Sequence, residues 1–357
     1  MRPPPPSPPR RAGMSTFRLP TLAMAFALSC LGAAPGAGAG TVTIRMGTLV
    51  PSGTAQHKVL LGLAEEWRQT GGDSLKFILY PDGRLGGESE MVKKMRIKQL
   101  NAAALTVVGL TEIDPGVAGL QMIPLLFKSW DEVDYVREKL RPLLEARLRA
   151  KGYAVLFWAD AGWVRFFSKE PALSPDDYKK MKMFTWTGDV KQTEIMKSLG
   201  YRPVVLETTD IPLGLNTDMI NAVPLPPLLA LASQAYRSAP HMLDLNWVPI
   251  VGAAVIRLDT WNQLPEPLRR QLTASAEAAG TKLRDLGRNE SDEAVRVMQQ
   301  RGLQVHAVPP ELQDDWQELA DSFYPKLRTM VIPPEIFDAV LRHVAEFRQT
   351  AGNPPTR

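Results

Sequence analysis

The stretch that decides the fold is Lys182–Pro227, KMFTWTGDVKQTEIMKSLGYRPVVLETTDIPLGLNTDMINAVPLPP. Its apolar residues change spacing from two to about four and back, which predicts strands that alternate with helices. The predicted strands are 182–185, 202–205 and 222–224, and the predicted helices are 189–198 and 209–215. This β-α-β-α-β order is typical of a small α/β domain, in which ligands lie where strand ends meet helix starts.

The same stretch carries large apolar side chains where its strands end and contains no catalytic set of residues. We expect four of them to face a cleft, namely Phe184, Trp186, Val223 and Leu225. The sequence therefore predicts an apolar ligand-binding wall.

A second unit of the same kind precedes this one. Strands are predicted at 41–49, 75–80 and 101–108, and helices at 56–69 and 88–97. A chain of 357 residues, of which 45% are hydrophobic and 22% charged, is long enough for two such lobes. The net charge of +4 is spread along helices that also carry acids, so a nucleic-acid partner has little support.

The connections predict how the lobes are joined. Strands at 153–159 and 164–168 are expected to cross between lobes, with a small polar hinge at Asp160–Gly162. Lobe I is then residues 40–160 and 250–300, which include a long helix from about 267, and lobe II is residues 161–249. Residues 301–357 are expected to form helices that pack across both lobes.

The first 39 residues are predicted to be a secretory signal peptide. A charged segment, an apolar run from Leu22 to Leu31 and the small residues Ala37–Ala39 follow in the order that such peptides require. Met14 is a candidate start, and the apolar run is too short for a permanent membrane span. The only cysteine, Cys30, leaves open the alternative of a lipid-anchored protein, so export to the periplasm is predicted either way.

Five segments in this order resemble one family. They are MGTLVPSGTAQHK (46–58), YPDGRLGGESEMVKKM (80–95), IPLLF followed by SWDEV (123–133), KEPALSPDDYKKMKM (169–183) and TWNQLPEPLRRQL (260–272). The chain resembles the periplasmic solute receptors of tripartite ATP-independent periplasmic (TRAP) transporters, of the C4-dicarboxylate receptor type.

That resemblance implies a two-lobed α/β periplasmic binding protein, type II-like, with hinge strands and long bracing helices. It implies closure of the lobes on a small-molecule ligand and delivery of that ligand to the membrane subunits of a TRAP permease. It implies no catalysis and no cofactor.

The chain departs from the family at the ligand site. Where the family pattern has an arginine that holds the substrate carboxylate, this chain has Phe184. A buried carboxylate that lacks such a partner costs at least about 2 kcal/mol, whereas a covered apolar side chain contributes about 1.5–3 kcal/mol. We therefore expect a largely apolar or aromatic ligand in place of a simple dicarboxylate.

Further candidate residues come from other segments. Arg165 falls near a second arginine of the family pattern, and either binds an acidic or carbonyl group or braces the lobes through a salt bridge. Trp163, Trp186 and Trp247 are candidates to stack on a ligand, with core packing as the alternative. Lobe I is expected to contribute strand-end residues, Thr48, Pro51 and Thr106.

Enzyme functions are disfavoured by the motifs. The four histidines are scattered without metal-ligand spacing, so no metal site is predicted, and no P-loop or nucleophile motif occurs. The remaining alternative is a periplasmic carrier of lipids or other hydrophobic molecules that has the same fold and no dedicated permease. An apolar cavity fits both functions.

Overall fold

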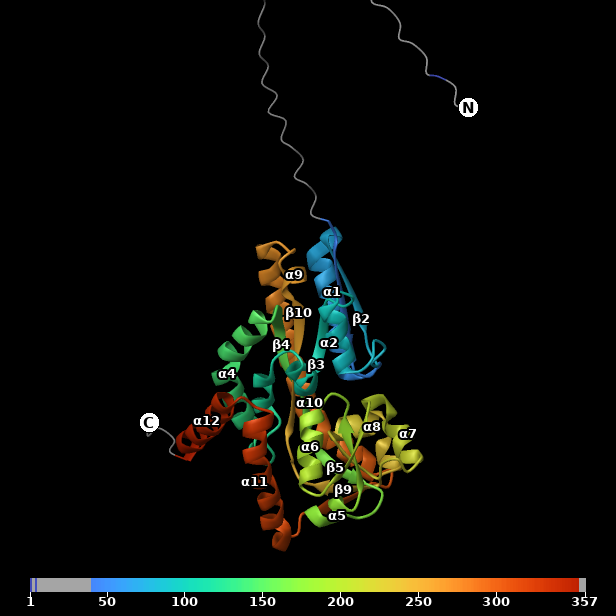
Figure 1. Ribbon diagram of the computed structural model, residues 1–357, viewed down its shortest axis with the longest axis vertical. Helices are drawn as coiled ribbons and strands as arrows, with labels where there is room; N and C mark the ends of the chain where they lie inside the picture. The colour runs from blue at the N-terminus through green and yellow to red at the C-terminus, as the bar shows by residue number, and fades with distance from the viewer. Residues whose placement is uncertain (2–3, 5–39, 353–357) are drawn as a thin grey trace, which may run out of the picture. The chain divides into compact units, whose positions relative to one another are not determined.

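The computed structural model describes residues 1, 4 and 40–352 of the chain. The expected signal peptide, including Cys30, lies outside the described residues apart from Met1 and Pro4. Two sheets organise residues 40–352, one of five strands in the order β2-β1-β3-β10-β4 and one of six in the order β11-β9-β5-β8-β6-β7 (Figure 1).

Lobe I is built on the five-stranded sheet. Its strands are β1 (Val42–Thr48), β2 (Leu75–Tyr80), β3 (Ala102–Thr106), β4 (Tyr153–Trp163) and β10 (Pro249–Arg257). β1 pairs in parallel with β2 and β3, and β10 runs antiparallel to β3 and β4. The helices of this lobe are α1 (Ala55–Gly71), α2 (Glu88–Arg96), α3 (Val107–Thr111), α4 (Trp130–Ala150) and α9 (Leu258–Trp261).

Lobe II is built on the six-stranded sheet. Its strands are β5 (Arg165–Ser168), β6 (Lys182–Trp186), β7 (Arg202–Leu206), β8 (Ala222–Leu225), β9 (His241–Asp244) and β11 (Gln304–Ala307). Its helices are α5 (Pro175–Lys179), α6 (Val190–Ser198), α7 (Ile211–Asn216) and α8 (Pro227–Ala232). The β-α-β-α-β order expected for residues 182–224 is observed, since β6, α6, β7, α7 and β8 follow one another.

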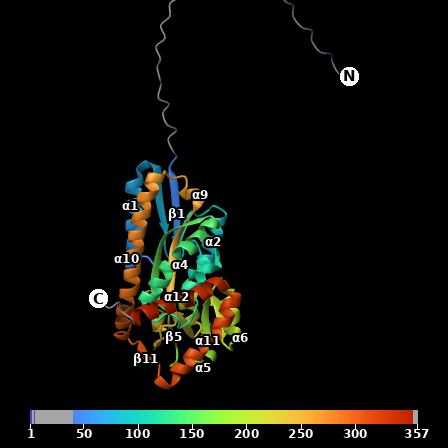
Figure 2. The ribbon, with the colours of Figure 1, turned by 90° about the vertical axis from the view of Figure 1, so that its left-hand side faces the viewer.

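Three segments join the lobes. β4 continues into β5 of the other sheet, β9 leads back into β10, and α10 (Glu266–Gln299) packs against both β4 and α8. Figure 2 shows α10 running beside α1 and on toward β11. Two C-terminal helices, α11 (Gln313–Met330) and α12 (Pro334–Gly352), contact lobe II and lobe I respectively.

Two local expectations were wrong. The strand expected at 101–108 ends at Thr106, because the Thr106 hydroxyl accepts a hydrogen bond from the Val108 N–H and begins α3. The polar hinge expected at Asp160–Gly162 is instead part of β4, which extends to Trp163 and shifts its register against β10 between Asp160 and Trp163. Asp160 does not form a loop there because its carboxylate is buried between two arginines, as described below.

Close packing of α10 on β4 depends on glycine. A Cβ at Gly287 would lie 2.2 Å from the Asp160 carbonyl oxygen, and one at Gly280 would lie 2.6 Å from the Phe157 Cβ. No side chain fits in that space, so the helix approaches the strand backbone directly.

We expect Gly287→Ala to lower the free energy of unfolding by about 1–3 kcal/mol, because the added methyl group overpacks a backbone contact. Thermal unfolding followed by circular dichroism measures the effect. Gly62→Ala in α1 is the matched control, since nothing lies within 4 Å of its Cβ position and alanine favours a helix by about 1 kcal/mol. A Gly287→Ala protein as stable as the Gly62→Ala protein would contradict the packing argument.

Candidate functional site

A large cavity of about 230 Å³ lies between the two sheets. Lobe I contributes the ends of β1 and β3, with Thr48 and Thr106, and the middle of β4 and β10. Lobe II contributes the segments that follow β6 and β7, with Thr187 and Thr208, and apolar residues of α8. The ends of parallel strands therefore meet at one place, which is where α/β folds bind ligands.

A smaller cavity of about 60 Å³ adjoins the large one and shares Val108, Gln121, Trp186 and Ile250 with it. Its wall includes eight aromatic side chains, namely Phe166, Tyr178, Phe184, Trp186, Tyr201, Trp247, Trp316 and Phe323. Their rings are in contact, with centroids 5.0 Å apart for Phe184 and Trp186 and 5.6 Å apart for Phe166 and Trp247. The shared residues make the two cavities parts of one candidate site.

The structure brings together six of the ten predicted site residues. Four of them, Thr48, Pro51, Thr106 and Trp186, line the large cavity. Phe184, Trp186 and Trp247 line the small one. The other four, Trp163, Arg165, Val223 and Leu225, line neither cavity.

Val223 and Leu225 lie in the core of lobe II instead of facing the cleft. Both are fully buried and belong to the same apolar cluster as Phe167. Successive residues of a strand point to opposite faces, and in β8 it is Pro224 that lines the small cavity. The expected strand is present, but its faces were assigned the wrong way round.

Arg165 braces lobe II against α10. Its guanidinium lies 3.2 Å from Asp244 and 3.7 Å from Asp292, and its Nε donates to Asn246. Of the two roles considered for this residue, the structure shows the salt bridge. Trp163 likewise packs on a protein side chain, with its ring centroid 4.8 Å from that of Trp130.

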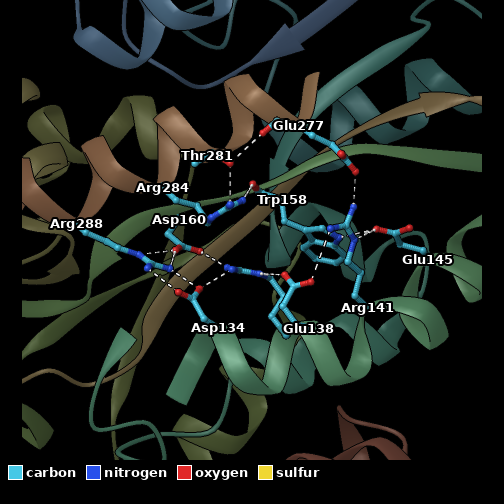
Figure 3. A network of polar contacts seen from close by, with 11 residues as sticks. Asp134, Glu138, Arg141, Glu145, Trp158, Asp160, Glu277, Thr281, Arg284 and Arg288 are labelled. Atoms are coloured by element: carbon cyan, nitrogen blue, oxygen red, sulfur yellow. Dashed lines mark hydrogen bonds and ion pairs between the residues drawn. The ribbon is translucent and has the colours of Figure 1, made fainter. Parts of the chain in front are cut away.

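A buried network of ions lies beneath the large cavity (Figure 3). Asp160 of β4 lines the cavity, but its carboxylate accepts from Arg137 of α4 at 3.2 Å and from the Arg288 Nε of α10 at 2.9 Å. Arg288 also donates to Asp134 at 2.8 Å. Burial raises the pKa of Asp160, and the two arginines oppose that shift. The network therefore neutralises Asp160 and connects three elements.

Glu88 is a site residue that the sequence reasoning missed. It is 8% exposed and lines the large cavity, yet its carboxylate accepts hydrogen bonds from the Thr106 N–H and hydroxyl, both at 2.8 Å, and from the Gly109 N–H at 2.7 Å. Burial raises the pKa of Glu88, and these donors oppose the shift. Its position after Gly86–Gly87 at a helix start was the available signal.

Gln121 was also missed, and nothing in the sequence pattern marks it. Its Oε1 accepts a hydrogen bond from the Val251 N–H at 3.0 Å, which fixes the orientation of the side-chain amide. The Nε2 group is therefore the donor that Gln121 offers to the two cavities it lines.

The lobes approach each other at the rim of the large cavity. A Cβ at Gly87 of lobe I would lie 2.1 Å from the Glu207 Oε2 of lobe II, and a Cβ at Gly188 of lobe II would lie 2.3 Å from the Ser89 Oγ of lobe I. Gly188 has φ +97°, a conformation that other residues rarely adopt. Glycine at these two positions permits direct contact between the lobes.

Asp189 and Gln192 line the small cavity beside the aromatic rings. Asp189 is 8% exposed, precedes α6 and has no cationic partner among residues 40–352. Burial raises its pKa to about 7, opposed by the backbone N–H of Gln192. The Gln192 Oε1 is buried without a hydrogen-bond partner.

The charge of the two cavities has one sign. Within residues 40–352 their lining includes Glu88, Asp160, Asp189 and Glu207, and includes no lysine, arginine or histidine.

In the same part of the chain no group of three or more metal-ligating side chains occurs. No helix there is long and apolar enough to cross a membrane.

Two α/β lobes joined by crossing strands and a long helix, with a cavity between facing strand ends, define a solute-binding protein. Residues 46–329 match the family Bacterial extracellular solute-binding protein, family 7. The chain belongs to this family, whose members are periplasmic solute receptors and not enzymes, as the resemblance implied.

Known relatives agree with this assignment. The chain is 23% identical over 246 residues to the C4-dicarboxylate-binding periplasmic protein DctP of Rhodobacter capsulatus, a match that covers 68% of this chain and 73% of that protein. Two solved structures share the fold, which confirms the expected architecture. The extracytoplasmic solute receptor DctP7 of Bordetella pertussis has a TM-score of 0.78 at 17% identity, over 85% of this chain and 99% of that one. A TRAP solute-binding protein from Ralstonia eutropha has a TM-score of 0.79 at 16% identity, over 86% and 99%.

The buried carboxyl of Asp189 makes stability depend on pH. Its pKa rises from 3.8 to about 7 on folding, so the folded state favours the protonated form, and stability is lost as the pH rises from about 4 to about 7. At one pKa unit per 1.36 kcal/mol, the loss is at most about 4 kcal/mol.

We expect Asp189→Asn, which does not titrate, to gain stability relative to the wild type by about 1–3 kcal/mol between pH 5 and pH 8. Urea unfolding at the two pH values measures this difference. Asp210→Asn, which removes an exposed acid of the same lobe, is the control and should show no such change. If the difference in stability between the wild type and Asp189→Asn is the same at pH 5 and at pH 8, the raised pKa of Asp189 is refuted.

Proposed function

We propose that this receptor captures a small, largely apolar or aromatic organic ligand between its lobes and delivers it to the membrane subunits of a TRAP permease. The observation that carries the proposal is the charge of the site, since no described residue that lines either cavity is cationic. Permease delivery follows from family membership, and the ligand class follows from the lining.

The physical reason is the cost of burying an unpaired carboxylate. In solution, water solvates such a group, and an arginine fork replaces that water in a closed site. The Ralstonia protein holds (S)-2-acetolactate, and a TRAP solute-binding protein from Sulfurospirillum deleyianum holds succinate. In this chain Phe184 lies in the wall of the small cavity, and Glu88 and Glu207 lie in the wall of the large one. An organic acid placed there would face acids without a compensating cation.

The alternative function, a carrier of lipids or hydrophobic molecules without a permease, is less well supported by cavity size. The cavities have volumes of about 230 Å³ and 60 Å³. Their combined volume is near the lower limit of roughly 300 Å³ that is usual for sites of drug-sized ligands. An enclosed volume of this size favours a small ligand over an acyl chain. Genes for a small and a large permease subunit beside the gene of this protein would separate the two functions.

Matched ligands test the proposed ligand class. We expect the protein to bind benzyl alcohol at least about ten times more tightly than benzoate, since the two differ in the charged group that the site cannot pair. Isothermal titration calorimetry on protein that has been unfolded and refolded to remove any bound molecule measures both affinities. Tight binding of benzoate or succinate would overturn the proposal. Mass spectrometry of the molecule released on unfolding provides an independent check.

Trp186 is the one aromatic side chain among the four that both cavities share, and is therefore the residue to change. We expect Trp186→Ala to weaken the binding of benzyl alcohol by about 1–3 kcal/mol, which is about 5-fold to 150-fold, because about 100 Å² of apolar contact is lost. Leu213→Ala, which shortens an exposed apolar side chain of the same lobe, is the control and should bind as the wild type does. Unchanged affinity in the Trp186→Ala protein would remove this residue from the site.

A further inference from the structure

The small cavity contains polar groups that the protein itself leaves only partly paired. The Asp189 carboxyl is buried, its one partner is the backbone N–H of Gln192, and it has no ion-pair partner among residues 40–352. The Gln192 Oε1 is buried, and no donor of the described chain reaches it. A buried acceptor without a donor and a buried acid without a cation both cost free energy, so their position beside one cavity indicates that a ligand supplies the donor and the charge.

The rest of the wall determines which donor fits. Eight aromatic side chains line the small cavity, and the face of an aromatic ring attracts a positive charge. Asp189 is the one acid among the described residues of this wall, and no described cation competes for it. A protonated nitrogen offers both the N–H donors and the charge, whereas a hydroxyl group offers one donor and no charge.

We propose that the ligand is an organic base whose protonated nitrogen enters the small cavity at Asp189 and Gln192, while its apolar body occupies the large cavity. The inference rests on the proposed function and specifies its ligand class. The four residues that the cavities share, Val108, Gln121, Trp186 and Ile250, place the two parts of the ligand next to each other. Gln121 and Trp186 then lie beside the bond that joins the charged end to the apolar body.

Binding of such a base depends on pH through Asp189. Its pKa of about 7 means that the carboxyl is mostly protonated at pH 6 and mostly ionised at pH 8, so affinity for a cation rises over this interval. Burial raises the pKa of Tyr178 and Tyr201, which also line the cavity and therefore keep their protons. The segments of lobe I and α11 that pack against the cavity contribute no charged side chain to its described lining.

The test adds a third compound to the matched pair, benzylamine, and uses the exported protein after ligand removal. We expect benzylamine to bind at least ten times more tightly than benzyl alcohol at pH 8, and this preference to fall severalfold at pH 6. In Asp189→Asn the preference should disappear, and a thermal unfolding transition as cooperative as that of the wild type shows that this protein is folded. Asp210→Asn should behave as the wild type.

Each other outcome overturns the proposal. Benzylamine that binds no better than benzyl alcohol, or not at all, removes the base from the ligand class. A preference for benzylamine that persists in Asp189→Asn removes Asp189 from the site. If benzyl alcohol still binds better than benzoate in these cases, the apolar-ligand function stands alone, whereas tightest binding of benzoate refutes both proposals.

Discussion

The ion pairs of Asp160 hold the two lobes and the site in one arrangement. Asp160 lies on the strand that crosses from lobe I toward lobe II, and its partners lie on α4 and on the helix that spans both lobes. A buried ion pair stabilises little when it is complete, but the loss of one partner leaves an uncompensated charge. The constraint therefore acts mainly on geometry: β4, α4 and α10 must stay together for the carboxylate to remain paired.

This constraint also determines the charge of the site. Asp160 faces the large cavity, and the arginines that neutralise it approach from behind, so they contribute no free donor to a ligand. Glu88 is in a similar position, because its lone pairs accept from Thr106 and Gly109. Asp160 and Glu88 thus use much of their hydrogen-bonding capacity within the protein. Asp189, in the adjoining small cavity, has only the backbone N–H of Gln192 as a partner among the described residues.

Much of the fold could be predicted from the sequence because it follows local periodicity. The strand at 75–80 has the observed bounds, and the long helix expected from about 267 begins at Glu266. The site was less predictable because it depends on partners far away in the chain. Arg288 is 128 positions from Asp160, and the Val251 N–H that orients Gln121 is 130 positions away.

The strand β8 shows where a local pattern is insufficient. All four of its residues are buried, so the sequence AVPL has no polar position to indicate which face meets the cavity. Only the pairing of β8 with β5 and β6 determines that Pro224 faces the cavity and that Val223 and Leu225 face the core. A fully buried central strand gives no alternation to interpret.

Without an arginine clamp, closure of the lobes must be stabilised by other contacts. Apolar area on the ligand contributes about 25 cal/mol per Å² once it is covered by both lobes, and the glycine contacts at Gly87 and Gly188 let the lobes approach closely enough to cover it. Closure also excludes water from Asp189, which raises the cost of leaving that carboxyl unpaired. A ligand that covers the apolar wall but offers no donor to Asp189 stabilises the closed form less. Under the proposed function, selectivity therefore comes from coupling apolar coverage to one buried acid, in place of the paired charges that hold an organic acid.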